Sequence, residues 1–162
     1  MTTDKSVSVA FCCLGNICRS PMAEAVFKHV VKEQDLESHF NVIDSCGTGA
    51  YHIGENPDSR SSATCLENGV PVNHKARQVC KADYSKFDYI IGMDEANIET
   101  LLRRQPSGTK AKVVLFGDFC EDSSFSRIVE DPYYGGVSGF QRNFEQVKHF
   151  SEVFLKKVVR DR

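Results

Sequence analysis

The sequence lacks a long hydrophobic run and has no block of like charge. Its N-terminal apolar stretch, residues 7–14, is too short to span a bilayer, and no small-residue cleavage pattern accompanies it. The 162 residues carry a formal net charge of −2, which gives no electrostatic reason to expect nucleic acid or an anionic membrane as a partner. We therefore expect a single domain over residues 1–162, with neither a signal peptide nor a membrane or nucleic-acid partner.

Sequence signatures of metal and nucleotide sites are also missing. The five histidines are scattered, no HExxH occurs, and no second Cys or His pair follows Cys13 and Cys18. No GxxxxGK[ST] motif is present, and His52 stands where a dinucleotide fingerprint needs its third glycine. We therefore expect neither a metal ion nor a cofactor.

Seven cysteines are present, an odd number in a chain long enough to fold without disulfides. Such a set indicates reduced thiols in an intracellular protein. This composition, together with the missing signal peptide, predicts a cytoplasmic location.

Strands alternate with helices along the chain. Buried apolar runs predict strands, and apolar stripes at helical spacing predict helices. The expected strands cover residues 6–13, 40–46, 87–93 and 112–116, and the expected helices begin at 20, 59, 95 and 140. This order predicts an α/β fold, with an open parallel sheet that has helices on both faces.

Particular residues mark the expected ends of the helices. Ser20 offers a capping hydroxyl before Pro21, and Asp94 offers a capping carboxylate before the third helix. Gly69 suits the C-terminal turn of the helix over 59–68. Ligands of such sheets bind beyond the carboxyl ends of the strands, which directs attention to the segment after Cys13.

The chain around Cys13 reads CCLGNICRSP, residues 12–21. This stretch has three cysteines and no acidic residue. Cys12 is predicted to pack on the opposite side of its strand from Cys13. Cys13 precedes a short loop whose backbone N–H groups, helix dipole and Arg19 guanidinium together would hold a phosphate. The same field favours the thiolate form of Cys13, and Ser20 is placed to donate a hydrogen bond to the sulfur. A free cysteine is often only a small buried residue, an interpretation that suits Cys12 better than Cys13.

Several segments together resemble one family. CLGNICRSPMAEA at 13–25 closely resembles the active-site loop of the low-molecular-weight protein tyrosine phosphatases. The likeness continues in the family's order through IDSCGT, GVPVNHKARQ, FDYIIGMDEAN and EDPYYG. The resemblance implies an open four-stranded parallel sheet with a phosphate-binding loop after strand 1, and metal-independent hydrolysis of phosphotyrosine.

The resemblance assigns a role to each matching position. Cys13 is the expected nucleophile that forms a cysteinyl phosphate, and Arg19 is expected to bind the phosphoryl oxygens. Ser20 would stabilise the thiolate. Asp131 in DPYYG matches the general acid, although on its own an Asp-Pro pair is more typical of a turn.

The same resemblance implies a set of substrate-binding and supporting residues. Asn16 would hold the loop by hydrogen bonds, with Ser45 and His74 as its partners. Tyr133 and Tyr134 would form one wall of an aromatic slot, with Tyr51 opposite. The predicted substrate-binding residues are Leu14, Gly15, Asn16, Ile17, Cys18, Ser20, Tyr51, Tyr133 and Tyr134.

The other cysteines receive separate interpretations. By resemblance, Cys18 is expected to form a reversible disulfide with Cys13 under oxidation. Cys12 departs from the family, which commonly has a branched apolar residue there. No catalytic position of the family matches the remaining four, which are expected to be structural: Cys46, Cys65, Cys80 and Cys120.

The predicted substrates are phosphotyrosine proteins and small aryl phosphates, so acid phosphatase activity is expected too. We expect a monomer that at most associates weakly with itself.

An arsenate reductase of the same fold would need further downstream cysteines, and Cys80 has no near partner. A protein-arginine phosphatase tends to have threonine at the position of Ile17. A catalytically silent phosphotyrosine-binding module is disfavoured because every expected catalytic group is present.

Overall fold

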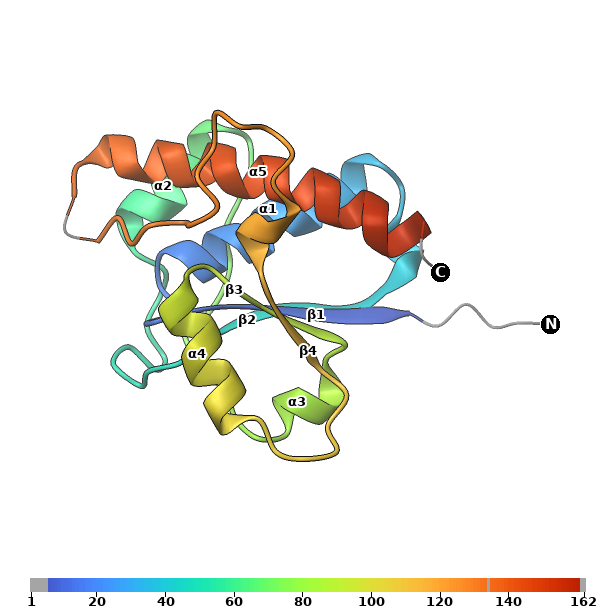
Figure 1. Ribbon diagram of the computed structural model, residues 1–162. Helices are drawn as coiled ribbons and strands as arrows, with labels where there is room; N and C mark the ends of the chain where they lie inside the picture. Colours follow the sequence, from blue (N-terminus) through green and yellow to red (C-terminus); the bar gives the residue numbers. More distant parts are fainter. Residues whose placement is uncertain (1–5, 134, 161–162) are drawn as a thin grey trace.

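The protein forms a parallel sheet of four strands in the order β2-β1-β3-β4 (Figure 1). The structure is a computed structural model that describes residues 6–133 and 135–160. The strands are β1 (Val7–Cys13), β2 (Phe40–Gly47), β3 (Tyr89–Gly92) and β4 (Lys112–Leu115). The helices are α1 (Arg19–Glu33), α2 (Ser59–Glu67), α3 (Asp83–Lys86), α4 (Glu95–Arg104) and α5 (Val137–Arg160), with short 3-10 turns η1 (Glu37–His39) and η2 (Phe116–Phe119).

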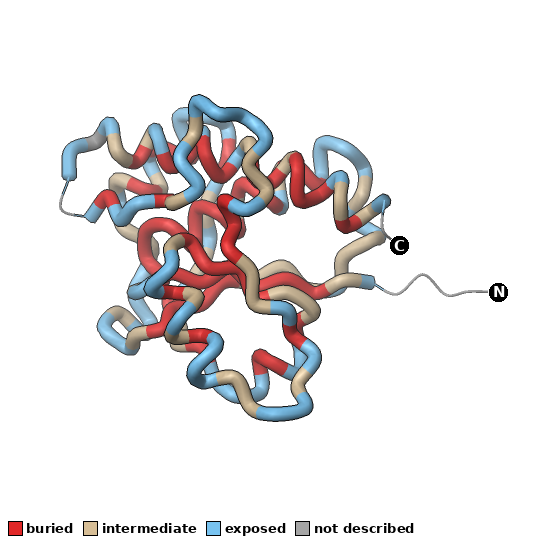
Figure 2. Tube along the Cα trace, viewed as in Figure 1, coloured by how far each residue is buried: buried red, intermediate tan, exposed pale blue. Residues whose placement is uncertain are grey.

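Helices cover both faces of this sheet. In Figure 1, α1, α2 and α5 lie on one side of the strands, and α3 and α4 lie on the other. Strand β1 has side chains buried on both faces, since Phe11 packs with α1 and α5 while Ala10 and Cys12 pack with α4 and its neighbours. Figure 2 shows the corresponding buried trace through the centre of the molecule. The predicted fold class and the predicted orientation of Cys12 are confirmed.

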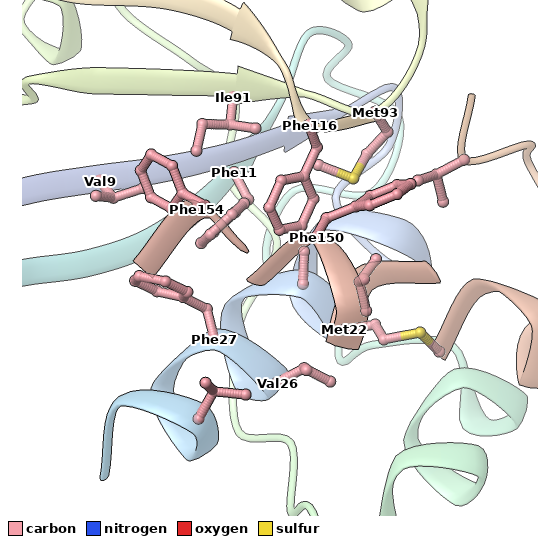
Figure 3. Close-up of a cluster of buried hydrophobic side chains, with 14 of the residues drawn as sticks. Val9, Phe11, Met22, Val26, Phe27, Ile91, Met93, Phe116, Phe150 and Phe154 are labelled. Carbon is pink, nitrogen blue, oxygen red and sulfur yellow. The ribbon is translucent and has the colours of Figure 1, made fainter. Parts of the chain in front are cut away.

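The larger core lies between the sheet and the helices α1 and α5, and it is rich in phenylalanine (Figure 3). Phe154 is fully buried there and meets three rings edge-on or tilted. Its ring centroid lies 5.4 Å from that of Phe27, 5.3 Å from that of Tyr89 and 4.9 Å from that of Phe119. Each of these four rings belongs to a different element, so the cluster joins α1, α5, β3 and η2.

The predicted elements are present, with differences at their ends. The third strand is shorter than the predicted 87–93, and Phe116 of the fourth belongs to η2. The predicted helix cap at Ser20 is wrong, because α1 begins at Arg19 and has no side-chain cap. The Ser20 hydroxyl instead turns toward Cys13. The cap at Asp94 is confirmed, since its carboxylate accepts the Asn97 N–H.

The strand order determines where a ligand would bind. From β1 the chain moves outward to β2 on one side, and β3 lies on the other side of β1. At such a reversal, the connections after adjacent strands leave a crevice beyond the carboxyl ends. The segments after Cys13 and Gly92 therefore meet at one edge of the sheet. Among the described residues, no helix is long and apolar enough to span a membrane.

Truncating the aromatic core should destabilise the protein strongly. Phe154→Ala removes a fully buried ring and leaves a cavity, so we expect the free energy of unfolding to fall by about 3–5 kcal/mol. Urea unfolding followed by circular dichroism measures this change. Leu102→Ala is the control, because Leu102 is 54% exposed on α4 and its truncation should cost about 0.5 kcal/mol or less. Equal losses in the two variants would contradict this description of the core.

Candidate active site

The loop over residues 14–18 connects β1 to α1 and exposes backbone donors. Three of its carbonyls accept hydrogen bonds. The Leu14 carbonyl accepts the N–H of Gly49 at 2.9 Å, the Ile17 carbonyl accepts the N–H of Asp58 at 2.8 Å, and the Cys18 carbonyl accepts the Ser61 hydroxyl at 2.9 Å. Among the described residues, none accepts a hydrogen bond from the N–H groups of residues 15–18. Free N–H groups at the start of a helix form an anion site, because the helix dipole adds positive potential there.

Asn16 holds this loop in an unusual backbone conformation. Its φ is +58°, which non-glycine residues rarely adopt, and its side chain is buried. The amide nitrogen donates to the hydroxyls of Ser20 at 2.8 Å and Ser45 at 3.1 Å. The amide oxygen accepts from His74 Nε2 at 2.7 Å and from the Arg77 N–H at 2.9 Å. Ser45 and His74, the two residues expected beside Asn16, thus both form hydrogen bonds with its amide.

Behind Asn16 lies a further layer of hydrogen bonds that the sequence patterns did not predict. The buried carboxylate of Glu24 accepts from the Ser45 hydroxyl at 2.7 Å and lies 3.3 Å from His74 Nδ1. Glu24, Asp44 and His74 have ligand atoms within 4.8 Å of one another, a spacing that a metal ion could use. These atoms already bond to Ser45, Asn16 and other side chains, so we interpret the cluster as the support of the loop.

Cys13 lies at the floor of the site and is only 2% exposed. Its sulfur is 3.0 Å from the Ser20 hydroxyl oxygen. Because Asn16 donates to that oxygen, the hydroxyl hydrogen is left to point at the sulfur or at the Cys46 carbonyl, 3.3 Å away. Ser20 is therefore placed to donate a hydrogen bond to a Cys13 thiolate.

Arg19 is the buried cation of the site, with 3% exposure. Its Nη1 donates to Asp94 Oδ2 at 2.6 Å and to the Val129 carbonyl at 3.0 Å, and its Nη2 lies 3.7 Å from Asp131 Oδ2. Burial opposes the charge of Arg19, but its interactions with Cys13, Asp94 and Asp131 raise its pKa overall. The guanidinium therefore stays charged in a fixed orientation.

Asp94 has two functions, and only one of them was predicted. One of its oxygens caps α4, accepting the Asn97 N–H at 2.8 Å, while the other orients Arg19. The sequence does contain a signal for the second function. Asp94 follows a predicted parallel strand, so it was expected at the same edge of the sheet as the loop after Cys13, and the pairing of β3 with β1 then brings the two together.

The loop opens into a pocket of about 390 Å³. Tyr51 and Tyr133 contribute exposed aromatic walls, with 73% and 37% exposure, and Tyr134 lies outside the described residues. Asn16 and Ser20 are absent from the lining, because their side chains lie behind the loop. The lining residues are Cys13, Leu14, Gly15, Ile17, Cys18, Arg19, Tyr51, His52, Asp131 and Tyr133.

His52 also lines the pocket, a position that the sequence patterns did not predict. Its ring packs on Gly15, where an added Cβ would come within 2.9 Å of His52 Cδ2. The His52 Nδ1 lies 3.2 Å from both carboxylate oxygens of Glu55, and its ring centroid is 6.4 Å from that of Tyr133. Its place beside Tyr51 in the sequence could have indicated this position in the wall.

The remaining cysteines differ in burial. Burial and the charge of Asp58 raise the pKa of Cys18 to about 12, so its thiol stays protonated at neutral pH. Cys46 and Cys65 are fully buried, as a structural role predicts, whereas Cys80 is exposed and Cys120 is half-buried. All seven are free thiols in the structure.

Comparisons with known proteins identify the family of this chain. The sequence profile of the low molecular weight phosphotyrosine protein phosphatases matches residues 8–162. The chain belongs to this family. The Saccharomyces cerevisiae low molecular weight phosphotyrosine protein phosphatase is 54% identical over 159 residues, which cover 97% of this chain and 99% of the relative.

Solved structures agree with this assignment. A protein tyrosine phosphatase from Entamoeba histolytica superposes with a TM-score of 0.91 at 39% identity, over 96% of this chain and 99% of that one. A Drosophila arginine phosphatase superposes with a TM-score of 0.86 at 33% identity, over 93% of this chain and 97% of that one. The predicted family is confirmed, and with it the prediction of a phosphotyrosine protein phosphatase.

Removing the Asn16 side chain should release the loop. Asn16→Ala removes the hydrogen bonds of a buried amide, leaves the half-buried Arg77 N–H without its acceptor and puts alanine at a positive φ, so the free energy of unfolding should fall by about 2–4 kcal/mol. Urea unfolding and phosphatase assays on the same samples measure stability and activity together, and activity should fall as well.

Asn41→Ala is the matched control, because Asn41 is exposed on β2. Its stability and activity should stay close to those of the wild type. Wild-type stability in Asn16→Ala would contradict the supporting role of this side chain.

Proposed function

We propose that this member of the family hydrolyses phosphotyrosine through a cysteinyl-phosphate intermediate, with Cys13 as nucleophile. The observation that carries the proposal is the group of free backbone donors at residues 15–18 around the buried Cys13 sulfur, with the charged Arg19 beside them. Such an arrangement stabilises three equatorial phosphoryl oxygens as charge spreads over them in the transition state. Substrate oxygens would accept from these N–H groups and from Arg19.

In the first step, the Cys13 thiolate attacks phosphorus and the bond from phosphorus to the aryl oxygen breaks. Asp131, in its protonated form, gives its proton to the departing phenolate. Its Oδ1 accepts the Tyr133 N–H at 3.0 Å, so Oδ2, on the side of Arg19, is the oxygen available for this transfer. The products are a phenol and a phosphoryl group on sulfur.

In the second step, water attacks the cysteinyl phosphate and the bond between sulfur and phosphorus breaks. Asp131, now a carboxylate, takes the proton of that water. The Ser20 hydroxyl, 3.0 Å from the sulfur, donates to the thiolate as it departs. Inorganic phosphate leaves, and the starting state is restored, because Asp131 again carries a proton and Cys13 is again a thiolate.

The pocket favours aryl esters over other phosphate monoesters. Cys13 is almost fully buried at its floor, while Tyr51 and Tyr133 line its walls. A flat ring would fill the space between the aromatic walls and bring its phosphate down to the sulfur. The proposed substrates are therefore phosphotyrosine proteins and small aryl phosphates.

Arginine phosphorylation is a second candidate, because a structural neighbour is named as an arginine phosphatase. The branched apolar side chain of Ile17 lines the pocket here, and it offers no hydroxyl to a guanidinium group. Arsenate reduction would need a thiol to carry a disulfide outward. Cys80 is exposed but does not line the pocket, and Cys65 is fully buried. Both observations favour phosphotyrosine.

The domain extent, the location and the partners of the protein are also proposals. We propose one phosphatase domain over residues 1–162, supported by a family match that extends over residues 8–162. We also propose a cytoplasmic monomer that needs no cofactor and has no nucleic-acid or membrane partner. The net charge of −2 and the set of free thiols support this setting.

A disulfide between Cys13 and Cys18 would protect the nucleophile from further oxidation. Peroxide would convert the Cys13 thiolate to a sulfenic acid with loss of hydroxide, and the Cys18 thiol would then displace water to form the disulfide. Both residues line the same pocket, separated by a short loop. A thiol reductant would return both to the reduced state.

Hydrolysis of p-nitrophenyl phosphate and of a phosphotyrosine peptide, with EDTA present, tests the proposed residues. Cys13→Ser should be inactive on both substrates because serine is not ionised at neutral pH. Asp131→Asn should lose about 10²–10⁴-fold on the peptide, whose phenolate leaves poorly without a proton. Vanadate should inhibit the wild type competitively.

Two variants away from the pocket are controls for this assay. Cys80→Ser and Asp122→Asn change an exposed thiol and an exposed carboxylate, and both should keep wild-type activity. Full activity in Cys13→Ser would overturn the proposed function. Arsenate-dependent use of thioredoxin that disappears in Cys80→Ser would favour the reductase instead.

Peroxide treatment tests the proposed disulfide. Wild-type activity lost to brief peroxide exposure should return on adding dithiothreitol, whereas Cys18→Ser should lose most of its activity permanently. Mass spectrometry of the peptide containing both cysteines follows the disulfide directly. Permanent inactivation of the wild type would contradict the protective role of Cys18.

A further inference from the structure

Arg60, in the first turn of α2, bonds closely with Asp58, the residue that caps this helix. The Arg60 Nε donates to Asp58 Oδ1 at 3.1 Å, and Nη2 donates to Oδ2 at 3.0 Å. The backbone N–H of Arg60 also donates to Asp58 Oδ1, at 2.8 Å. These bonds lower the pKa of Asp58 and raise that of Arg60, so the pair is charged at neutral pH. These bonds fix the planar guanidinium of Arg60 at the N-terminal end of α2.

The same guanidinium also contacts the segment that carries Asp131. Its Nη2 donates to the Tyr133 carbonyl at 3.0 Å. Its central carbon lies 5.5 Å from the ring centroid of Tyr133 and 4.8 Å from that of Phe140, distances at which a cation is attracted to an aromatic face. Phe140 is fully buried near the start of α5. Arg60 therefore ties Tyr133 to two helices.

Tyr133 in turn holds the carboxylate of Asp131. Its backbone N–H donates to Asp131 Oδ1 at 3.0 Å, which leaves Oδ2 on the side of Arg19. The Asp131 side chain is 40% exposed, so few core contacts restrain it. Its orientation depends on the turn that Tyr133 closes.

The other end of this arrangement is bonded to the phosphate loop. The Asp58 N–H donates to the Ile17 carbonyl at 2.8 Å, and the Ser61 hydroxyl donates to the Cys18 carbonyl at 2.9 Å. The start of α2 is therefore attached to the loop that surrounds the Cys13 sulfur. A continuous set of hydrogen bonds leads from that loop through Asp58 and Arg60 to Tyr133.

We propose that Arg60 is a positioning residue that holds the general-acid segment in register with the phosphate loop. This inference rests on the proposed function of Asp131 as general acid. Arg60 is not among the residues that line the pocket, so it acts through Tyr133 and Asp131 rather than on the substrate. A planar fork is required, because one ammonium group cannot bond both carboxylate oxygens of Asp58 and reach the Tyr133 carbonyl.

Leaving-group dependence separates positioning of the acid from general damage to the protein. We would measure kcat/KM of wild type, Arg60→Gln and Arg60→Lys with a phosphotyrosine peptide and with 2,4-dinitrophenyl phosphate. The dinitrophenolate departs without a proton, so its release does not depend on Asp131. Arg103→Gln is the matched control, because Arg103 is exposed on α4 and pairs with Glu99 at 3.9 Å.

Both Arg60 variants should lose about tenfold or more on the peptide and less than about threefold on the dinitrophenyl ester, because a misplaced general acid affects only the first. Activity on the ester also shows that the variants are folded. Arg60→Gln in the Asp131→Asn background should cause no further loss on the peptide, because both changes remove the same contribution. Arg103→Gln should match the wild type.

Three results would overturn the inference. They are equal losses on both substrates, wild-type behaviour of Arg60→Lys, and a loss in the double variant that multiplies the two single losses. The control variants distinguish this failure from failure of the proposed function. If Cys13→Ser is inactive and Asp131→Asn is selectively impaired while the Arg60 variants match the wild type, only the role of Arg60 is wrong.

Discussion

The N–H groups of residues 15–18 must stay free of protein acceptors in a loop that is otherwise packed. Because these donors make no bonds within the protein, they do nothing to hold the loop, which would tend to rearrange if nothing else held it. The protein holds it through its other groups. Asn16 uses both ends of its amide on surrounding residues, and the Ile17 carbonyl bonds to the start of α2. The donors then remain available for a phosphoryl group.

Residues far apart in the sequence meet at this loop because of the strand order. Cys13 ends β1, and Asp94 follows the adjacent β3, so the buried Arg19 finds its carboxylate partner next to the nucleophile. Asp131 arrives from the segment between η2 and α5, within 3.7 Å of the same guanidinium. Several supports are shared between two tasks. Asp94 caps α4 while it orients Arg19, and Ser45 contacts Asn16 while it donates to Glu24.

Local patterns in the sequence predicted the strands, the long helices and the nucleophile loop, because apolar spacing and turn residues act over short distances. The family resemblance extended this to Asp131, Ser45 and His74. The partners that depend on tertiary placement were missed, among them Glu24, Asp94 as partner of Arg19, and His52. Nothing in the spacing of a Glu on a helix shows that it faces a particular histidine. The expected Ser20 cap failed for the same reason, since Cys13 and Asn16 bind its hydroxyl instead.

The central claim is that the Cys13 sulfur becomes phosphorylated during turnover. Rapid acid quenching of the enzyme mixed with an aryl phosphate, followed by mass spectrometry of its peptides, tests this directly. The account predicts a phosphoryl group on Cys13 that appears during turnover and is absent when Cys13 is replaced by serine. A phosphoryl group on another side chain, such as His52, or turnover with no phosphorylated enzyme at any time, would contradict it.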